Sequence, residues 1–316
     1  MAKLCLKARP TVKQLADRLQ PIEGEFPQGL ELYLDAADIR DEKAMATAVA
    51  NLEAHALSPD FALLIEGPVG SLDGEFFDVT RESPADYLVV KRLADMARRI
   101  GAKAVNIHLI APTDDVSLLN LECRQDLLRR SLPILRHFVE LMQTAGATPT
   151  IEDMPAVLRM RQGGYYFSPI GMPGADLHWA AEQVPGLKLL PDTSHAGLYL
   201  NARAAAFGRR PITDEERLIP WLDPFLDYVR QLPDEPDSLL GYFQSLQPYV
   251  VNAQISNASG LLGEGLPYDE GDYDLDPTIQ WLGQHAQHIV TETLEPNQDD
   301  AVYMRDALVQ MRRVVA

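Results

Sequence analysis

Short runs of apolar residues recur along the chain, and each is followed by a stretch in which apolar positions repeat every three or four residues. The short runs are typical of buried strands, and the longer stretches have the period of amphipathic helices. A short apolar run alone does not separate a strand from a buried helix, so the prediction rests on the regular alternation. We predict eight strands, over Lys3–Lys7, Leu30–Leu34, Phe61–Glu66, Ala104–Leu109, Thr148–Glu152, Leu187–Pro191, Val250–Ile255 and His288–Glu292.

The helical stretches carry start and stop signals. Ser83 is a capping residue placed before Pro84, which suits the first turn of a helix, and Gly101 suits the end of that helix. A second long helix is predicted over Leu118–Gly146, where Pro133 either kinks the helix or divides it in two. Each of these helices follows a predicted strand.

Strands that alternate with helices predict a parallel sheet, and eight strands are the number that closes a (β/α)8 barrel. An open doubly wound sheet is the structural alternative, but no Gly-x-Gly-x-x-Gly and no Walker phosphate loop supports it. We interpret Arg209–Tyr249, which is rich in proline and acid, as an enlarged connection. The expected fold is α/β: residues 1–316 form a single (β/α)8 TIM barrel with a loop–helix insertion after strand six.

Composition narrows the class of partner. The chain of 316 residues is 46% hydrophobic and carries 28 basic and 46 acidic residues, which gives a net charge of −18. A charge of this sign repels the nucleic-acid backbone. The N-terminus does not resemble a signal peptide and no apolar run is long enough to span a membrane, so we expect a cytoplasmic protein. The sequence favours a small-molecule substrate, without nucleic acid or membrane, and leaves a homo-oligomer open.

Polar residues stand at the ends of the last four predicted strands. Glu152 ends strand five, Asp192 ends strand six with His195 three residues later, and strands seven and eight carry Gln254 and Glu292. The βα loops at these ends form the pocket of a barrel. Three carboxylates buried together repel one another unless a cation offsets their charge. The four oxygen donors therefore predict a divalent metal site for Mn²⁺ or Mg²⁺, with Co²⁺ or Zn²⁺ as alternatives.

Other interpretations of these residues remain open. Asp192 precedes Thr193 and Ser194, so it could cap the next helix instead of binding a metal. Lys7 ends the first strand and could face either the pocket or the rim.

The motifs resemble those of the xylose isomerase-like TIM-barrel superfamily of sugar isomerases and epimerases, which also contains endonuclease IV. The resemblance covers nearly the whole chain. Asp192–Gly197 resembles the Asp-x-x-His segment of the family, and Glu152 and Glu292 match its metal glutamates in strands five and eight. Gln254 stands where the family often has histidine, as in hydroxypyruvate isomerase-like and 3-dehydroshikimate dehydratase-like branches. His108 resembles the histidine at the end of strand four.

The resemblance implies a metal-dependent isomerase or epimerase of a small sugar or keto-polyol that acts through an enediolate. One of Glu152 and Glu292 would remove the proton beside the carbonyl, and the other would return a proton. His195 would bind a substrate oxygen or simply hold Asp192, and His108 has either a substrate-binding or a structural role. The Gly-Glu-Gly loop that the family has after strand seven matches either Gly263–Gly265 or the later segment around Glu270.

Three other functions are compatible with the same residues. A dehydratase would remove water from a cyclic keto-polyol through the same enolate, and a non-catalytic barrel would only bind sugar. An abasic-site endonuclease fits less well because the chain is acidic and has few histidines near the strand ends. Strand three, for example, ends in Glu66-Gly67-Pro68.

Overall fold

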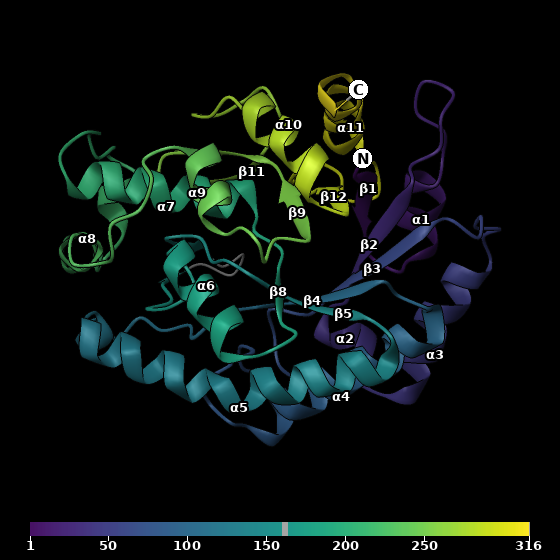
Figure 1. The fold of residues 1–316 in the computed structure, drawn as a ribbon, viewed down its shortest axis with the longest axis horizontal. Helices are drawn as coiled ribbons and strands as arrows, with labels where there is room; N and C mark the ends of the chain where they lie inside the picture. Colours follow the sequence, from purple (N-terminus) through teal and green to yellow (C-terminus); the bar gives the residue numbers. More distant parts are fainter. Residues whose placement is uncertain (160–163, 316) are drawn as a thin grey trace.

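Eight parallel strands form the centre of the computed structural model, which describes residues 1–159 and 164–315 (Figure 1). Every predicted strand is present, with ends that differ from the prediction by two residues at most. The strands are Lys3–Ala8 (β1), Gly29–Tyr33 (β2), Ala62–Glu66 (β3), Ala104–His108 (β4), Thr148–Glu152 (β5), Lys188–Leu189 (β8), Asn252–Ile255 (β9) and His288–Thr291 (β12).

The sheet closes on itself. Its order is β8-β5-β4-β3-β2-β1-β12-β9, and all the pairs are parallel. The two outer strands meet, because the Leu189 amide donates to the Tyr249 carbonyl at 3.0 Å and the Gln254 amide donates to the Pro191 carbonyl at 3.1 Å. The predicted (β/α)8 barrel is therefore confirmed.

Helices surround the barrel, with α4 and α5 along one side and α10 and α11 on the opposite side in the view of Figure 1. None of the described helices is both long and apolar enough to cross a lipid bilayer. The helices are Val12–Arg18 (α1), Ala36–Ile39 (α2), Glu42–Glu53 (α3), Pro84–Ile100 (α4), Leu121–Ala145 (α5), Gly174–Gln183 (α6), Thr193–Ala206 (α7), Leu222–Val229 (α8), Leu239–Ser245 (α9), Asp276–His285 (α10) and Val302–Val315 (α11).

The start and stop signals act as the sequence predicts. The Ser83 hydroxyl accepts from the Ala85 amide at 3.2 Å, and α4 ends at Gly101 in the left-handed region. Helix α5 runs as one helix through Pro133. The expected insertion after strand six follows α7 and holds α8 and α9.

Two small two-stranded antiparallel sheets were not predicted, because each of their strands is short and only partly apolar. They pair Leu158–Arg159 (β6) with Tyr165–Tyr166 (β7), and Asn257–Ser259 (β10) with Gly263–Leu266 (β11).

Alternation along the strands divides the side chains between two cores. In β1, Leu4 and Leu6 join the large core under the helices, whereas Cys5 belongs to a separate buried cluster. Successive residues of a strand point to opposite faces of the sheet, so this second cluster is an apolar plug inside the barrel. The members of the plug are Cys5, Ala62, Leu64, Ala104 and Val290.

Polar residues follow the plug on the same inner face. Two residues beyond Cys5, Leu64, Ala104 and Val290, at the C-terminal side of each strand, come Lys7, Glu66, Asn106 and Glu292. The fold thus places a layer of charged and polar side chains at the mouth of the barrel, directly above an apolar floor.

A tight backbone approach fixes the loop after strand five. Gly171 has φ +88°, and a Cβ there would lie 2.1 Å from the Leu109 carbonyl oxygen, just beyond β4. We expect Gly171→Ala to lower the free energy of unfolding by about 2–5 kcal/mol, because left-handed strain adds to displacement of this carbonyl. Urea denaturation would measure the loss.

Gly74 is the matched control, since it has φ +90° and nothing within 4 Å of the position of a Cβ. Gly74→Ala should cost only the left-handed strain, about 1–2 kcal/mol. Equal losses in the two variants would contradict the close approach at Gly171.

Candidate metal centre and active site

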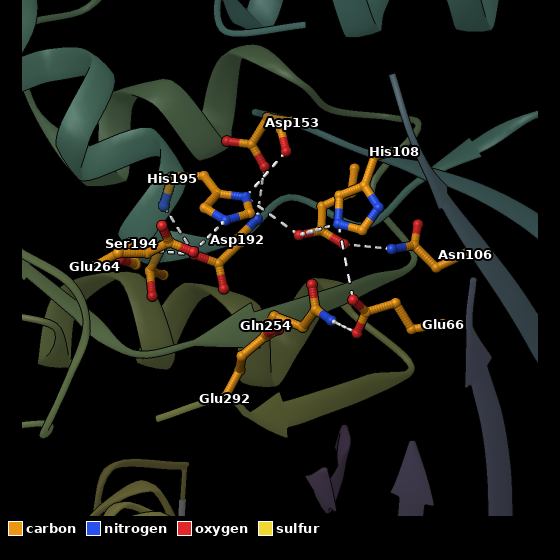
Figure 2. Close-up of polar contacts among 12 residues, drawn as sticks. Glu66, Asn106, His108, Asp153, Asp192, Ser194, His195, Gln254, Glu264 and Glu292 are labelled. Atoms are coloured by element: carbon orange, nitrogen blue, oxygen red, sulfur yellow. Dashed lines mark hydrogen bonds and ion pairs between the residues drawn. The ribbon is translucent and has the colours of Figure 1, made fainter. Parts of the chain in front are cut away.

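The four predicted metal donors lie at the C-terminal ends of consecutive barrel strands (Figure 2). Glu152 ends β5, Asp192 lies between β8 and α7, Gln254 is in β9, and Glu292 directly follows β12. Asp192 and Gln254 are paired across the β8–β9 closure, and the Glu292 amide donates to the Ile255 carbonyl at 2.9 Å. Glu152, Asp192 and Gln254 are buried, and Glu292 is half-buried.

Each of these four side chains has one buried oxygen atom that accepts no hydrogen bond. These atoms are Glu152 Oε1, Asp192 Oδ2, Gln254 Oε1 and Glu292 Oε2. A buried polar atom without a partner costs free energy, and a divalent cation is one partner that oxygen donors of this kind can bind. The donor set therefore fits a hard divalent ion.

Two further glutamates, Glu31 and Glu66, belong to groups of possible ligands whose atoms lie close together. Among the described residues, two groups of three have ligand atoms within 4.8 Å of one another: Glu66 with His108 and Glu152, and Glu31 with Glu66 and Glu292. The acids of the predicted set, Glu152, Asp192 and Glu292, do not form such a group. Glu66 is shared by both groups, so the two overlap.

Lys7 faces into the mouth rather than toward the rim, which answers the question that the sequence left open. Its ammonium group forms ion pairs with Glu66 Oε2 and Glu292 Oε1, which belong to β3 and to the end of β12. Burial acts to lower the pKa of Lys7, but Glu292, Glu66 and Glu31 outweigh it and raise that pKa well above its usual value. The surrounding carboxylates therefore favour the charged form of Lys7.

Side-chain amides hold the carboxylates in place. Gln254 donates from Nε2 to Glu31 Oε2 at 2.7 Å and to Glu66 Oε2 at 3.0 Å, and Asn106 donates from Nδ2 to Glu152 Oε2. Because the amide nitrogen of Gln254 is used in this way, its Oε1 is left without a hydrogen bond.

His195 lies between two glutamates. Its Nδ1–H donates to the Asp153 carbonyl at 3.0 Å and lies 3.2 Å from Glu152 Oε1, while its Nε2 lies 3.3 Å from Glu264 Oε1. Burial favours the neutral ring, but Asp192, Glu152 and Glu264 outweigh it and raise the pKa of His195 well above its usual value. The ring is therefore a buried cation that can donate protons in hydrogen bonds.

His108 has the opposite protonation. Its Nε2 lies 3.6 Å from Glu152 Oε1 and 3.7 Å from Glu66 Oε1, and its Nδ1 has no hydrogen-bond partner. Burial, together with the charges of His195 and Lys7, lowers the pKa of His108 to about 3. A neutral imidazole is the form that binds metal ions, so His108 suits a ligand or a contact to an uncharged substrate group.

Asp192 does cap the next helix, as the alternative interpretation proposes, but with only one of its oxygens. Oδ1 accepts from the amides of Ser194 at 2.6 Å and His195 at 2.8 Å, whereas Oδ2 accepts nothing. The Asp192 amide in turn donates to Asp153 Oδ1 at 2.8 Å. The cap thus fixes the carboxylate and leaves its second oxygen available.

Burial shifts the acids of the mouth toward the protonated form. It raises the pKa of Asp192 and of Glu292 to about 7 and that of Glu31 to about 8, and it raises the pKa of Glu152 well above its usual value. Neighbouring carboxylates add to these shifts, and Lys7 and His195 oppose them. Groups whose pKa lies near 7 can both accept and donate protons at neutral pH.

No protein-family model matches the chain, and no curated protein matches its sequence. Solved structures do share the fold. A D-tagatose 3-epimerase-like protein is 13% identical, with a TM-score of 0.65, over 99% of this chain and 98% of that chain. A 3-keto-D-glucoside 4-epimerase from E. coli is 11% identical, with a TM-score of 0.60, over 99% and 100% of the two chains.

An AP endonuclease of family 2 from Brucella melitensis also shares the fold, at 13% identity and a TM-score of 0.56, over 99% of both chains. At these identities the likeness concerns the fold. The chain therefore shares the (β/α)8-barrel fold of these proteins, which is the fold that the resemblance in its motifs implies.

Sequence reasoning assigned no role at the site to Glu31, Glu66, Asn106 or Glu264. The sequence does contain a pattern that could identify Glu31, Glu66 and Asn106. Each is a polar residue on the inner face of a predicted strand, and an apolar or small residue lies two positions before it. Glu264 lies on β11 and contacts His195, so of the two Gly-Glu-Gly candidates it is the one beside the site. Only the folded hairpin distinguishes it from Glu270.

The raised pKa of Glu31 has a consequence for stability without metal. The folded state binds a proton at Glu31 up to about pH 8, whereas the unfolded chain releases it near pH 4.5, so stability falls as the pH rises through this window. We expect Glu31→Gln, in EDTA, to be more stable than the wild type at pH 8 by roughly 1–3 kcal/mol. Urea denaturation from pH 5 to 9 measures this.

Glu53→Gln, at an exposed position in α3, is the control and should follow the wild-type curve. If Glu31→Gln lost stability with pH as steeply as the wild type does, Glu31 would not have the raised pKa on which this prediction rests.

Proposed function

We propose that this chain is a divalent-metal-dependent isomerase or epimerase of a small sugar or keto-polyol, acting by proton transfer beside a carbonyl. The observation that carries the proposal is the set of four buried oxygens on Glu152, Asp192, Gln254 and Glu292 that accept no hydrogen bond. They lie at the ends of four consecutive strands, where barrel enzymes hold their substrates. The sugar epimerases of the same fold support this substrate class.

The residues present fit a metal ion of the Mn²⁺ or Mg²⁺ type. Glu152, Asp192, Gln254 and Glu292 would hold it, and the group of Glu66, His108 and Glu152 is an alternative position that shares Glu152. Bound there, a divalent ion supplies Lewis acidity, which polarises a carbonyl and offsets negative charge on its oxygen.

Glu152 and Glu292 are the proton-transfer pair in this proposal. They come from β5 and from the end of β12, so they can approach a bound substrate from different sides. The one that is deprotonated removes the proton from the carbon beside the carbonyl, which gives an enediolate. The other returns a proton to the opposite face or to the neighbouring carbon. In the metal-free protein burial raises the pKa of both glutamates, to about 7 for Glu292.

His195 and Lys7 stabilise negative charge during this reaction. The protonated His195 ring, held by the Asp153 carbonyl, places a positive charge beside the substrate at the mouth. Glu264, half-buried on β11, accepts from the same ring and keeps it charged. Lys7 pairs with one oxygen of Glu292, whose other oxygen accepts no hydrogen bond.

A dehydratase would use the same base and the same enolate, and would differ only in expelling a β-hydroxyl group. Product analysis separates the two, since loss of water from a cyclic keto-polyol gives an ultraviolet-absorbing enone and epimerisation does not. Because an AP endonuclease has the same fold, nucleic acid is a further candidate for the substrate. Cleavage of an abasic-site duplex in Mn²⁺ or Zn²⁺ would favour that function over the proposed one.

Solvent deuterium tests the proton-transfer pair. Ketoses and keto-polyols would be incubated with the protein in D₂O, and NMR would measure the deuterium in each. One substrate should gain deuterium at the carbon beside its carbonyl. Glu292→Gln and Glu152→Gln should each slow this exchange by at least ~10³-fold, because each removes a proton-transferring group.

Glu53→Gln, on the surface of α3, should exchange at the wild-type rate. Exchange that survives in both Glu292→Gln and Glu152→Gln would rule out their role as acid and base.

Removal of metal gives a second, independent test. Dialysis against EDTA should abolish the exchange, and Mn²⁺ should restore it and raise the melting temperature, because binding to the folded state alone stabilises that state. Full activity in EDTA, with no thermal shift on adding Mn²⁺ or Mg²⁺, would contradict the metal dependence.

A further inference from the structure

Lys7 has no place among the four predicted donors, yet it lies at the centre of the acid cluster. Its ammonium group contacts Glu66 and Glu292, which are two members of the group completed by Glu31. Glu31 is fully buried, and its Oε1 has no hydrogen-bond partner. Three carboxylates this close would be suited to a cation, and a cation from the chain itself is already there.

We propose that the ammonium group of Lys7 is a built-in cation that fills the Glu31–Glu66–Glu292 group and so keeps a divalent ion out of it. The inference rests on the proposed metal-dependent function, because it concerns how many ions the mouth admits. In this view Lys7 is a positioning residue that confines the metal to the Glu152 side of the barrel.

The contacts of Lys7 explain why the ammonium stays where it is. The side chain is 10% exposed, and the charge lies 5.6 Å from the centre of the Tyr33 ring, which can add a cation–π attraction. Lys7 pairs in register with Glu31 on the neighbouring strand β2, so the backbone of the barrel sets its position. An ammonium fixed in this way repels a second positive ion placed beside it.

The position of Glu66 shows which ion site the ammonium affects. Glu66 belongs to both groups of three: its Oε2 pairs with Lys7, and its Oε1 lies 3.7 Å from His108 Nε2. With Oε2 held by Lys7 and by Gln254, only one oxygen of Glu66 faces the His108–Glu152 side. Two divalent ions that share Glu66 are therefore disfavoured as long as Lys7 is charged.

Removal of the charge at position 7 should open the second site. Metal-free wild type, Lys7→Met and Lys7→Arg would be titrated with Mn²⁺, with free Mn²⁺ measured by electron paramagnetic resonance. We expect Lys7→Met to bind one more ion per chain than the wild type, because methionine removes the charge at similar length. Lys7→Arg retains the charge and should bind the wild-type number.

Two further variants make the result specific. The double variant Lys7→Met with Glu31→Gln should lose the additional ion, since it lacks one of the three carboxylates. Lys13→Met, at a lysine that is 79% exposed, should bind the wild-type number.

If Lys7→Met unfolds without metal because its acids repel, Mn²⁺ should refold it, whereas NaCl of equal ionic strength should not. Circular dichroism measures this, and failure of Mn²⁺ to refold the variant would overturn the inference. Equal stoichiometry of Lys7→Met and the wild type would also overturn it. In a further outcome, the wild type binds no ion while Lys7→Met binds one. That result would support the inference and contradict the proposed function.

Discussion

Repulsion among buried carboxylates is the constraint on which the rest of the barrel mouth depends. Glu31, Glu66, Glu152 and Asp192 are all buried there, and Glu292 lies beside them. Desolvation of one carboxylate is costly, and each neighbour of the same sign adds to the cost. The surrounding residues offset this cost. Lys7 and His195 bring positive charge, and Gln254 and Asn106 donate hydrogen bonds. Four oxygens of the mouth still accept no hydrogen bond, and these are the atoms on which the proposed metal site rests.

The barrel makes such a concentration of charge possible because its strands separate two environments. On the inner face, the apolar plug formed by Cys5, Ala62, Leu64, Ala104 and Val290 closes the floor. Two residues beyond Cys5, Leu64, Ala104 and Val290 come the polar residues Lys7, Glu66, Asn106 and Glu292, on the same inner face at the mouth. On the outer face the same strands pack against helices, which hold their spacing. The rigid scaffold thus keeps charged groups together that would separate in a flexible loop.

The sequence predicts the fold well because strand and helix periods, and the caps at Ser83 and Gly101, are local signals that agree with the tertiary structure. The position of the four expected donors at the mouth could be predicted for the same reason, since a strand end in a barrel has a known direction. Glu31 and Lys7 could not be assigned, because their role depends on contacts across four strands, β1, β2, β3 and the end of β12. Glu264 was ambiguous because its place depends on a hairpin with weak local signals.

The central claim is that Glu152, Asp192, Gln254 and Glu292 bind one divalent ion together. A crystal structure of the protein grown in Mn²⁺, with anomalous diffraction measured to locate the ion, tests it most directly. We expect an anomalous peak within bonding distance of Glu152 Oε1, Asp192 Oδ2, Gln254 Oε1 and Glu292 Oε2. A peak held only by Glu66, His108 and Glu152, or no peak at the mouth, would contradict it.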